Sequence, residues 1–338
     1  MNIILALDAM GGDHGPTEIV PAALYELEKN RGLSLVLVGQ EDELHKELER
    51  NNARVNDRLT VHPATEIVGM DELPSHALRN KKDSSMRVAI DLVKDGRAHA
   101  CVSAGNTGAL MATARFVLKM LPGIDRPAIC STMPGSAGRT THLLDLGANV
   151  DSTSEQLFQF AVMGAELASA VNNKENPTVA LLNVGEEEIK GNDRVKQAAV
   201  LLSNSHINYV GFVEGNDIYS GKVDVIVCDG FVGNIALKAS EGVAEFLLEN
   251  TRIEFNKALY GKLAALICMP VLKAIRRKID PRRYNGASLL GLRGIVLKSH
   301  GSADKVSFAH AIEEAIIEVE KDIPNRISTE LERLFPEG

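Results

Sequence analysis

The chain has 338 residues, 45% of them hydrophobic, so the sequence predicts a large buried core, or two closely merged lobes that share one sheet. Its 45 acidic and 37 basic residues give a formal net charge of −8, which excludes a protein whose overall field attracts nucleic acid. The cysteines lie far apart, with no spacing typical of a zinc site. We expect thiols in a reducing cytosol at Cys101, Cys130, Cys228 and Cys268.

Apolar runs of strand length alternate with segments of helical period, beginning with a run at the N-terminus that has no basic leader. This alternation predicts an α/β fold, in which a mainly parallel, Rossmann-like sheet carries helices on both faces. We expect strands at 3–6, 35–38, 100–103, 128–132, 142–145, 179–183, 209–213, 223–228 and 294–298. We expect helices at 17–30, 42–51, 84–95, 107–120, 152–171, 194–203, 233–249 and 303–321.

The segment 251–291 departs from this alternation, because it is locally basic and apolar and shows no clear strand. We interpret it as a helical insertion that protrudes from a single α/β catalytic domain spanning residues 1–338, built as one unit or as two merged lobes. The longest uncharged apolar run, 263–272, covers about half of the roughly 20 residues that a membrane-spanning helix needs. No membrane crossing is therefore expected.

On a helical wheel this segment is amphipathic. Its apolar face is formed by Leu259, Leu263, Leu266, Ile267 and Pro270. The opposite side and the residues that follow are basic, at Lys262, Lys273, Arg276, Arg277, Lys278, Arg282 and Arg283. A stretch of this kind can lie in a membrane interface but cannot span it, so we expect a cytoplasmic protein with peripheral membrane contact. Packing in a dimer and docking of an acidic partner are alternative uses of the same side chains.

Five loops rich in glycine and small polar residues each follow a predicted strand directly. They occupy 8–15, 103–108, 185–191, 229–234 and 299–303. In open α/β sheets, ligands bind beyond the carboxyl ends of the strands, where helix starts aim free backbone N–H groups and glycine lets the backbone approach an anion. We therefore expect the five loops to gather at one end of the sheet and to form an oxyanion site.

Neither of the common nucleotide-binding patterns, GxxxxGK[ST] and GxGxxG, occurs in these loops, so free phosphate or a phosphorylated substrate is a better match than a nucleotide. Asp71 and the acidic run at 186–188 could suggest a metal. Three consecutive carboxylates do not share a face, however, and are typical of a solvated cluster. We predict no metal and no cofactor.

Four of these segments resemble the signature blocks of the PlsX family, the fatty acyl-ACP:phosphate acyltransferases. The blocks are DAMGGDHGP at 8–16, SAGNTGA at 103–109, NVGEEEIKGN at 183–192 and DGFVGN at 229–234, and they span most of the chain. The resemblance implies a fold like that of isocitrate and isopropylmalate dehydrogenases, a homodimer, and acyl-ACP and inorganic phosphate as substrates. It also implies that the acyl phosphate product enters phosphatidic acid synthesis, with a membrane glycerol-phosphate acyltransferase as a further partner.

Transfer of an acyl group to phosphate needs no serine or cysteine nucleophile, but it needs charge shielding for phosphate and donors for the thioester oxyanion. By the resemblance, Lys190 is the cation that binds phosphate or stabilises the oxyanion, and Asn234 donates a hydrogen bond to the substrate carbonyl. The structural alternatives are an exposed, solvated lysine and the N-cap of a helix.

Other residues of the loops are expected to line the phosphate and substrate site. Ser103, Asn106 and Thr107 suit phosphate, although they could instead cap the helix that begins near residue 107. His300 could bind phosphate or act as an acid, but a thiol leaving group with a pKa of about 8.5 needs little protonation. The expected binding residues are Asp8, Gly11, Gly12, Asp13, His14, Ser103, Gly105, Asn106, Thr107, Gly108, Gly233, His300 and Ser302.

Three other functions compete with this one. A metal- and NAD-dependent β-decarboxylating dehydrogenase would need clustered arginines and a paired-aspartate metal site, which the sequence lacks. A phosphate acetyltransferase that uses acyl-CoA is a second alternative enzyme. A non-enzymatic peripheral scaffold would recruit partners through 251–291 and would use the glycine loops only as helix caps.

Overall fold

The computed structural model describes residues 2–257 and 259–334, and within these ranges no side chain is described at 259, 275–279, 281 and 283. Eleven strands of this part of the chain form one sheet. They are β1 (Ile3–Asp8), β2 (Leu33–Gly39), β3 (Leu59–Pro63), β4 (Ala100–Ser103), β5 (Ala128–Pro134), β6 (Thr140–Leu144), β7 (Val179–Leu182), β8 (Tyr209–Val213), β9 (Val225–Val227), β10 (Ala287–Leu290) and β11 (Ile295–Lys298).

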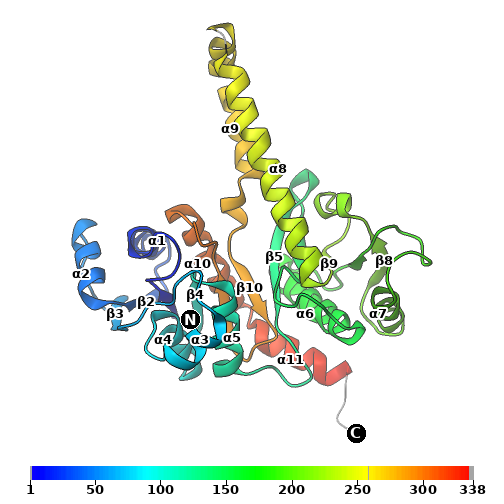
Figure 1. Ribbon diagram of the computed structural model, residues 1–338, viewed down its shortest axis with the longest axis horizontal. Helices are drawn as coiled ribbons and strands as arrows, with labels where there is room; N and C mark the ends of the chain where they lie inside the picture. The colour runs from blue at the N-terminus through cyan, green and yellow to red at the C-terminus, as the bar shows by residue number, and fades with distance from the viewer. Residues whose placement is uncertain (1, 258, 335–338) are drawn as a thin grey trace.

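Helices connect the strands and lie on both faces of the sheet (Figure 1). The α-helices are α1 (Pro16–Lys29), α2 (Glu41–Arg50), α3 (Pro74–Asn80), α4 (Ser85–Lys94), α5 (Thr107–Leu118), α6 (Ser154–Asn172), α7 (Asp193–Ser203), α8 (Gly230–Asn256), α9 (Leu259–Ile279), α10 (Lys305–Glu320) and α11 (Ile323–Leu334). Three short 3-10 helices are η1 (Ser136–Gly138), η2 (Gly215–Tyr219) and η3 (Pro281–Tyr284).

The strands divide into two parallel groups. The order across the sheet is β3-β2-β1-β4-β11-β10-β5-β6-β9-β7-β8. Strands β3, β2, β1, β4 and β11 are parallel to one another, and so are β6, β9, β7 and β8. The pairs β11–β10, β10–β5 and β5–β6 are antiparallel, so the two groups run in opposite directions. We call the carboxyl ends of β1, β4 and β11 the first edge, and those of β6, β9 and β7 the second edge.

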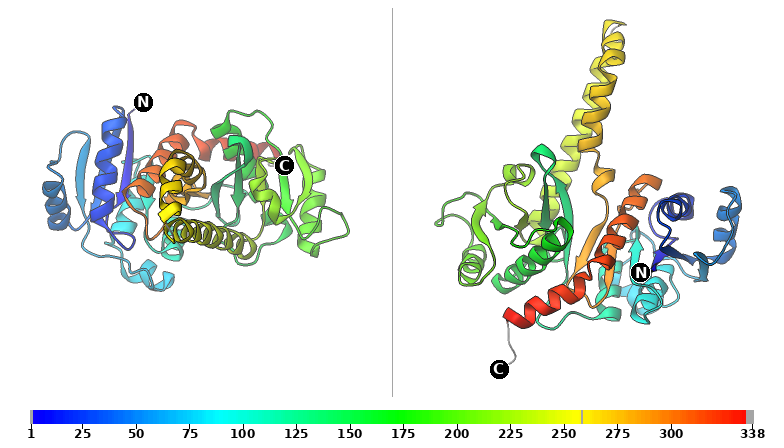
Figure 2. Two further views of the ribbon diagram at one scale, coloured as in Figure 1. Left: turned by 90° about the horizontal axis from the view of Figure 1, so that it is seen from above. Right: turned by 180° about the vertical axis from the view of Figure 1, so that it is seen from behind.

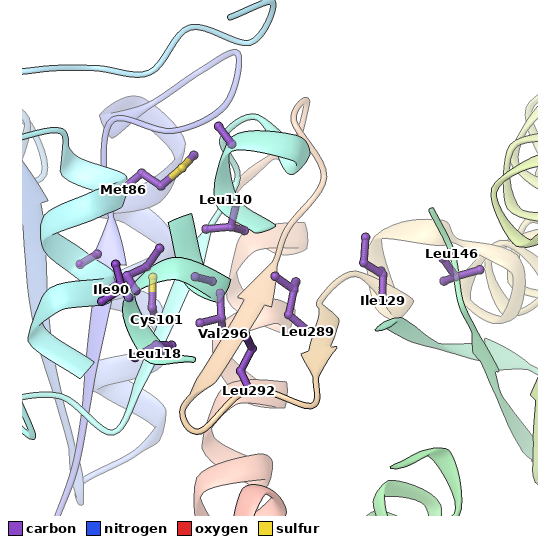
Figure 3. Packing of buried hydrophobic residues seen from close by; sticks show 14 of the residues in the cluster. Met86, Ile90, Cys101, Leu110, Leu118, Ile129, Leu146, Leu289, Leu292 and Val296 are labelled. Atoms are coloured by element: carbon purple, nitrogen blue, oxygen red, sulfur yellow. The ribbon is translucent and has the colours of Figure 1, made fainter. Parts of the chain in front are cut away.

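Buried apolar side chains on the two faces of the sheet hold the layers together. On β1, Leu5 and Leu7 belong to a cluster with residues of α1 and α10, whereas Ala6 belongs to a cluster with residues of α4 and α5. Figure 3 shows part of this second cluster, with Met86 and Ile90 of α4 and Leu110 of α5. A third cluster joins the second group of strands to α6 and α11. Burial on both faces explains why the strands appear in the sequence as continuous apolar runs. The predicted mainly parallel α/β fold is confirmed.

Helices α8 and α9 form a long hairpin that projects away from the sheet (Figures 1 and 2). Helix α8 is continuous to Asn256, and the range 251–291 also contains β10, between β11 and β5 in the sheet. The expectation that this range holds no strand is therefore wrong. The strand was hard to recognise in the sequence because β10 has only four residues, and it pairs antiparallel with both neighbours. Within the described residues, no helix combines the length and apolarity that crossing a membrane requires.

Apart from the short 3-10 helices, three other elements have no counterpart among the predicted ones. Strand β3 has only one buried residue, and α3 is only seven residues long. Helix α11 buries Ile323, Ile327 and Leu331 at helical spacing, a signal that the sequence contained. Every predicted strand and helix overlaps an observed element of its type. Three cysteines are buried free thiols and Cys268 is exposed.

Candidate active site

Three of the five glycine loops meet at the first edge. The backbone N–H of Asp13 donates to the carbonyl of Gly301 at 2.8 Å, which joins the loop after β1 to the loop after β11. Gly12 has a φ of +85°, and a Cβ there would lie 2.8 Å from the Gly301 oxygen and 2.9 Å from Cβ of Ala104. A Cβ on Gly11 would lie 2.6 Å from Oδ2 of Asp8. Glycine is therefore required for this approach of the loops.

The carboxylate of Asp8 forms the floor of this junction. It is buried and accepts hydrogen bonds from Ser85 Oγ at 2.5 Å and from Ser103 Oγ at 2.6 Å. Ser103 Oγ in turn accepts from the backbone N–H of Gly105 at 3.1 Å. Burial raises the pKa of Asp8, and the two serine hydrogen bonds oppose that shift. Asp8 and Ser103 thus fix the loops rather than project into solvent.

Lys298 is a residue of this junction that the sequence analysis missed. Its side chain is only 8% exposed, and Nζ donates to the carbonyl of Ala104 at 3.2 Å and to the carbonyl of Ser299. Burial lowers the pKa of Lys298 to about 8, against the opposing charges of Asp8 and Asp13. The signal available in the sequence was a lysine that ends an apolar strand immediately before a glycine loop.

The loop after β4 shows which motif residues act as caps. Asn106 is the N-cap of α5, because its side-chain oxygen accepts from the N–H of Ala109 at 3.0 Å. Its amide nitrogen donates to the carbonyls of Met70 at 2.8 Å and Glu72 at 3.0 Å. The capping alternative therefore holds for Asn106, whose side chain is occupied. Thr107 is exposed at the start of the helix.

The rim of the first edge consists of polar side chains that reach solvent, among them Asp13, His14, His300 and Ser302. Nδ1 of His300 accepts from the backbone N–H of Ser302 at 3.2 Å and lies 2.8 Å from Ser302 Oγ. The proton of the neutral ring is therefore on Nε2. Burial and then the charge of Lys238 lower the pKa of His300, so the ring is neutral at pH 7 and Nε2 is a hydrogen-bond donor.

The second edge holds the loop that contains Lys190. The side-chain amide of Asn183 donates to the carbonyls of Gly185 at 3.1 Å and Lys190 at 3.2 Å, so it closes the loop at both ends. A Cβ on Gly191, which has a φ of +90°, would lie 2.1 Å from Asn183 Oδ1. Lys190 is exposed, with Nζ 2.7 Å from Glu187, and this hydrogen bond raises the pKa of Lys190.

The start of α8 explains why residue 233 is a glycine, and it shows that Asn234 is not the helix cap. Asp229 is the N-cap, and its side chain accepts from the N–H of Val232 at 2.8 Å. A Cβ on Gly233 would lie 1.9 Å from the carbonyl oxygen of Asp145, so the glycine is required for packing of α8 on the loop after β6. Asn234 lies within the helix and is exposed, so the N-cap alternative for Asn234 is wrong.

The expectation that all five loops share one end of the sheet is also wrong. The loops after β1, β4 and β11 lie at the first edge, and those after β7 and β9 lie at the second edge, because the antiparallel central strands reverse the chain direction. Helix α8 connects the two edges. It begins after β9, and the charge of its Lys238 affects both Lys298 and His300. Asn234 is one helical turn before Lys238 and therefore lies on the same face of α8.

Of the hairpin residues predicted to contact a partner or a membrane, the described apolar ones lie on the projecting part of α9, and Arg282 lies at its base beside the start of α10. Leu263, Leu266 and Ile267 are more than half exposed, and Lys273 is exposed on α9. Arg282 is ion-paired with Asp280 at 2.7 Å and with Asp304 at 2.9 Å, at the base of the hairpin. The other predicted contact side chains lie outside the described residues, at Leu259, Arg276, Arg277, Lys278 and Arg283.

Among the residues that the structure describes, no three His, Cys, Asp or Glu side chains are grouped so that they could hold a metal ion. Besides the carboxylates of Asp8, Asp13 and Glu187, the two edges carry hydrogen-bond donors, which are lysines, amides, hydroxyls, imidazoles and backbone N–H groups. Such donors suit an anion and the oxygen of a polarised carbonyl.

The chain matches the family model described as fatty acid synthesis protein over residues 3–326. It belongs to this family. The resemblance to the PlsX family is thereby confirmed. The chain is 63% identical to the phosphate acyltransferase of Methylococcus capsulatus over 331 residues, which cover 98% of this chain and 97% of the relative. It is 56% identical to the phosphate acyltransferase of Legionella pneumophila strain Paris, over 100% of this chain and 98% of the relative.

Solved structures with a similar fold have far lower sequence identity. A phosphotransacetylase from Streptococcus pyogenes superposes with a TM-score of 0.62 at 18% identity, over 94% of both chains. A 4-hydroxythreonine-4-phosphate dehydrogenase from Klebsiella pneumoniae superposes with a TM-score of 0.53 at 15% identity, over 94% of this chain and 98% of that one. At this identity the likeness concerns the fold alone, and it agrees with the dehydrogenase-like fold that the family resemblance implied.

Proposed function

We propose that the protein transfers a fatty acyl group from the thioester of acyl-ACP to inorganic phosphate and releases acyl phosphate for phosphatidic acid synthesis. The observation that carries this proposal is the position of α8. One face of this helix bears an exposed amide at Asn234 and, one turn later, Lys238, whose charge reaches the glycine-loop junction at the first edge. The carbonyl donor is therefore one helical turn from a cation whose charge reaches the anion site. Relatives of nearly equal length named phosphate acyltransferase support the same conclusion.

In the reaction, a phosphate oxygen attacks the thioester carbonyl carbon and a new C–O bond forms. The carbonyl oxygen becomes an oxyanion, which then re-forms the double bond as the C–S bond breaks and the thiolate leaves. Asn234 donates a hydrogen bond to the oxyanion, and Lys190 supplies positive charge when it exchanges Glu187 for the reacting group. The exposed ion pair between Lys190 and Glu187 contributes little to stability, so this exchange is easy.

Phosphate binds at the first edge. Its donors are the hydroxyl of Thr107, Nε2–H of His300 and the backbone of the glycine loops, with Asp8 and Ser103 as the buried support. A thiolate with a pKa of about 8.5 for its conjugate acid is a good leaving group, so no residue has to protonate it. His300 therefore acts as a hydrogen-bond donor to phosphate rather than as a general acid.

The helical hairpin serves the larger partners. Exposed apolar residues near the middle of α8, such as Phe246 and Leu247, pair with a second copy of the chain in a homodimer. The exposed Leu263 and Ile267 on α9 make reversible contact with the membrane, where a glycerol-phosphate acyltransferase receives the product. The basic residues towards the base of the hairpin, such as Lys273 and Arg282, dock the acidic carrier protein.

The test is an assay with palmitoyl-ACP and inorganic phosphate in the absence of metal and nucleotide, with acyl phosphate trapped as the hydroxamate. We expect product that depends on both substrates. Palmitoyl-CoA in place of palmitoyl-ACP tests the alternative phosphotransacetylase, and NAD with a divalent cation tests the alternative dehydrogenase. Turnover that appears only with NAD and the cation, or a preference for the CoA thioester, would contradict the proposal.

A further inference from the structure

The first edge contains a buried cation for which the reaction as described gives no role. Among the residues whose side chains are described, Lys298 is the only buried lysine, and no arginine is buried. It ends β11, and its ammonium lies between the loop after β4 and the loop after β11, where Nζ donates to the carbonyls of Ala104 and Ser299. Burial of an ammonium is costly unless charge and hydrogen bonds compensate it, so its position requires an explanation.

The charged groups that face this ammonium come from three elements. Asp8 at the end of β1 and Asp13 in the following loop are the acidic ones, and Lys238 on α8 is a second cation. Lys238 donates to Glu241 at 3.1 Å, so its charge is partly balanced on its own helix. His300 is neutral and adds no charge. Without Lys298, two carboxylates would dominate the junction and repel a phosphate anion.

We propose that Lys298 is a positioning residue for phosphate, because its ammonium ties together two of the loops around the anion and its charge offsets Asp8 and Asp13. This inference rests on the proposed function for the identity of the anion. Three features distinguish a positioning role of Lys298 from simple core packing. The ammonium is at the carboxyl end of a strand, it contacts backbone of two glycine loops, and those loops contact the third at Gly12.

The first experiment removes the charge. In Lys298→Met the side chain keeps its unbranched shape up to Cε but loses the ammonium, and in Lys298→Arg the charge is retained. Lys305→Gln is the matched control, because Lys305 begins α10 after the same loop but is exposed. Calorimetric titration with inorganic phosphate at pH 7 should show affinity at least tenfold weaker in Lys298→Met. The arginine variant should recover part of this loss, and the control should change less than twofold.

The steady-state constants provide a readout that general damage to the fold would not reproduce. We expect Lys298→Met to raise KM for phosphate at least tenfold, while KM for palmitoyl-ACP changes less than twofold. Equal increases in both constants, or an unchanged affinity for phosphate, would overturn the proposal.

A second experiment tests the wild-type protein and needs no methionine variant, which keeps the proposal testable if Lys298→Met does not fold. Sulfate is used as the probe because its charge does not change between pH 7 and pH 9.5. Since burial lowers the pKa of Lys298 to about 8, sulfate affinity of the wild-type protein should fall above that value, by up to about tenfold per pH unit. In Lys298→Arg this alkaline decline should disappear, because the guanidinium stays charged. A flat profile in the wild-type protein would overturn the proposal.

These measurements also separate the two hypotheses. If the wild-type protein binds phosphate and sulfate with the expected pH dependence but forms no acyl phosphate, the proposed function fails while the role of Lys298 in anion binding stands. If acyl phosphate forms but neither anion responds to Lys298, the proposed function stands and the role of Lys298 fails.

Discussion

The two edges of the sheet differ in how firmly their functional side chains are held. At the first edge Asp8, Ser103 and Lys298 are buried, and each hydrogen-bonds within the contacting loops. At the second edge the loop bases are fixed, but Lys190 and Asn234 themselves are exposed. A closed, preformed junction suits a small anion of constant shape. An open edge suits a bulky thioester donor whose carbonyl must be reached from outside.

The largest expected effect on turnover concerns the two exposed residues at the open second edge. We expect Asn234→Ala and Lys190→Ala each to lower turnover on the order of 10²-fold or more, because each removes a group that stabilises developing charge. Hydroxamate formation from palmitoyl-ACP at saturating phosphate measures the effect. Both side chains are exposed, so the free energy of unfolding should change little.

The matched control for this pair is Asn192→Ala on the same edge. Asn192 is the N-cap of α7 and accepts from the N–H of Val195 at 2.9 Å. Its loss should cost about 1 kcal/mol of stability and leave turnover nearly unchanged. If Lys190→Ala behaved like this control, Lys190 would be only an exposed partner of Glu187.

A second prediction concerns the contact that fixes α8 between the two edges. Gly233→Ala places a methyl carbon 1.9 Å from the carbonyl oxygen of Asp145, so the helix must shift or the loop must move. We expect a loss of about 1–3 kcal/mol in the free energy of unfolding, measured by urea denaturation, together with reduced turnover.

Gly242→Ala is its control on the same helix, because a Cβ at Gly242 meets no atom within 4 Å. Alanine in an exposed helix interior should stabilise the protein by about 0.5–1 kcal/mol relative to glycine. If both substitutions had the same effect on stability, the close contact of Gly233 with Asp145 would not fix α8.

The sequence predicted most elements and the chemical character of the loops, but it could not predict which edge each loop occupies. Apolar runs such as 128–132 and 179–183 carry no information about strand direction. Direction here depends on β10, four residues long, and on its antiparallel pairing with β11 and β5. A reversal of this kind is a property of the assembled sheet, not of any single segment.

The roles of individual site residues were likewise only partly predictable from the sequence. The sequence identified Asn106 and Asn234 as either caps or ligands, and only the hydrogen bonds distinguish them, since Asn106 is a cap and Asn234 is not. Asp145 contacts Gly233 on a helix far along the chain, so local spacing gave no sign of its role. Asn183 acts within its own loop, on Gly185 and Lys190, but the residue pattern alone did not show that its amide closes the loop. Lys298 stands at the end of a predicted strand, but its burial depends on three loops that are distant in the chain. The sequence therefore did not show that it is buried.

A third prediction tests the seam where the two groups of strands meet. Glu318 on α10 is buried against Ser288 of β10, and burial raises its pKa to about 8, with the hydrogen bond from Ser288 opposing the shift. The folded protein thus keeps this proton in a pH range where the unfolded chain, with the ordinary value of 4.5, has lost it. The free energy of unfolding should therefore decrease as pH rises from 4.5 towards 8, by up to about 1.4 kcal/mol per pH unit from this group.

Glu318→Gln keeps the acceptor for Ser288 but cannot lose a proton. Urea denaturation of both proteins at pH 5.5, 6.5 and 7.5 should show the variant gaining stability relative to the wild-type protein as pH rises. Other carboxyl groups, such as Glu314, titrate in both proteins and cancel in the difference. Parallel curves for the two proteins would mean that Glu318 carries no proton in the folded state.

The smallest expected effect on turnover comes from the hairpin, which lies outside both edges (Figure 1). Leu263 is 57% exposed and Ile267 is 80% exposed, one turn apart on α9, so both reach a common surface. Leu263→Glu with Ile267→Glu places two carboxylates on that surface. We expect loss of sedimentation with vesicles that contain phosphatidylglycerol, while turnover on palmitoyl-ACP in solution stays within twofold.

Salt and a control double variant decide whether this loss reports membrane contact. Each lysine or arginine close to an anionic surface contributes about 1 kcal/mol, so the wild-type protein should release from the vesicles as ionic strength rises. Val200→Glu with Val55→Glu makes the same charge change at exposed valines on α7 and in the loop before β3, and it should sediment like the wild-type protein. Unchanged sedimentation of the hairpin variant would remove the membrane role. A shift from dimer to monomer on a sizing column would instead assign these leucine and isoleucine side chains to the subunit interface, and the apolar surface of α9 would then be internal to the assembly.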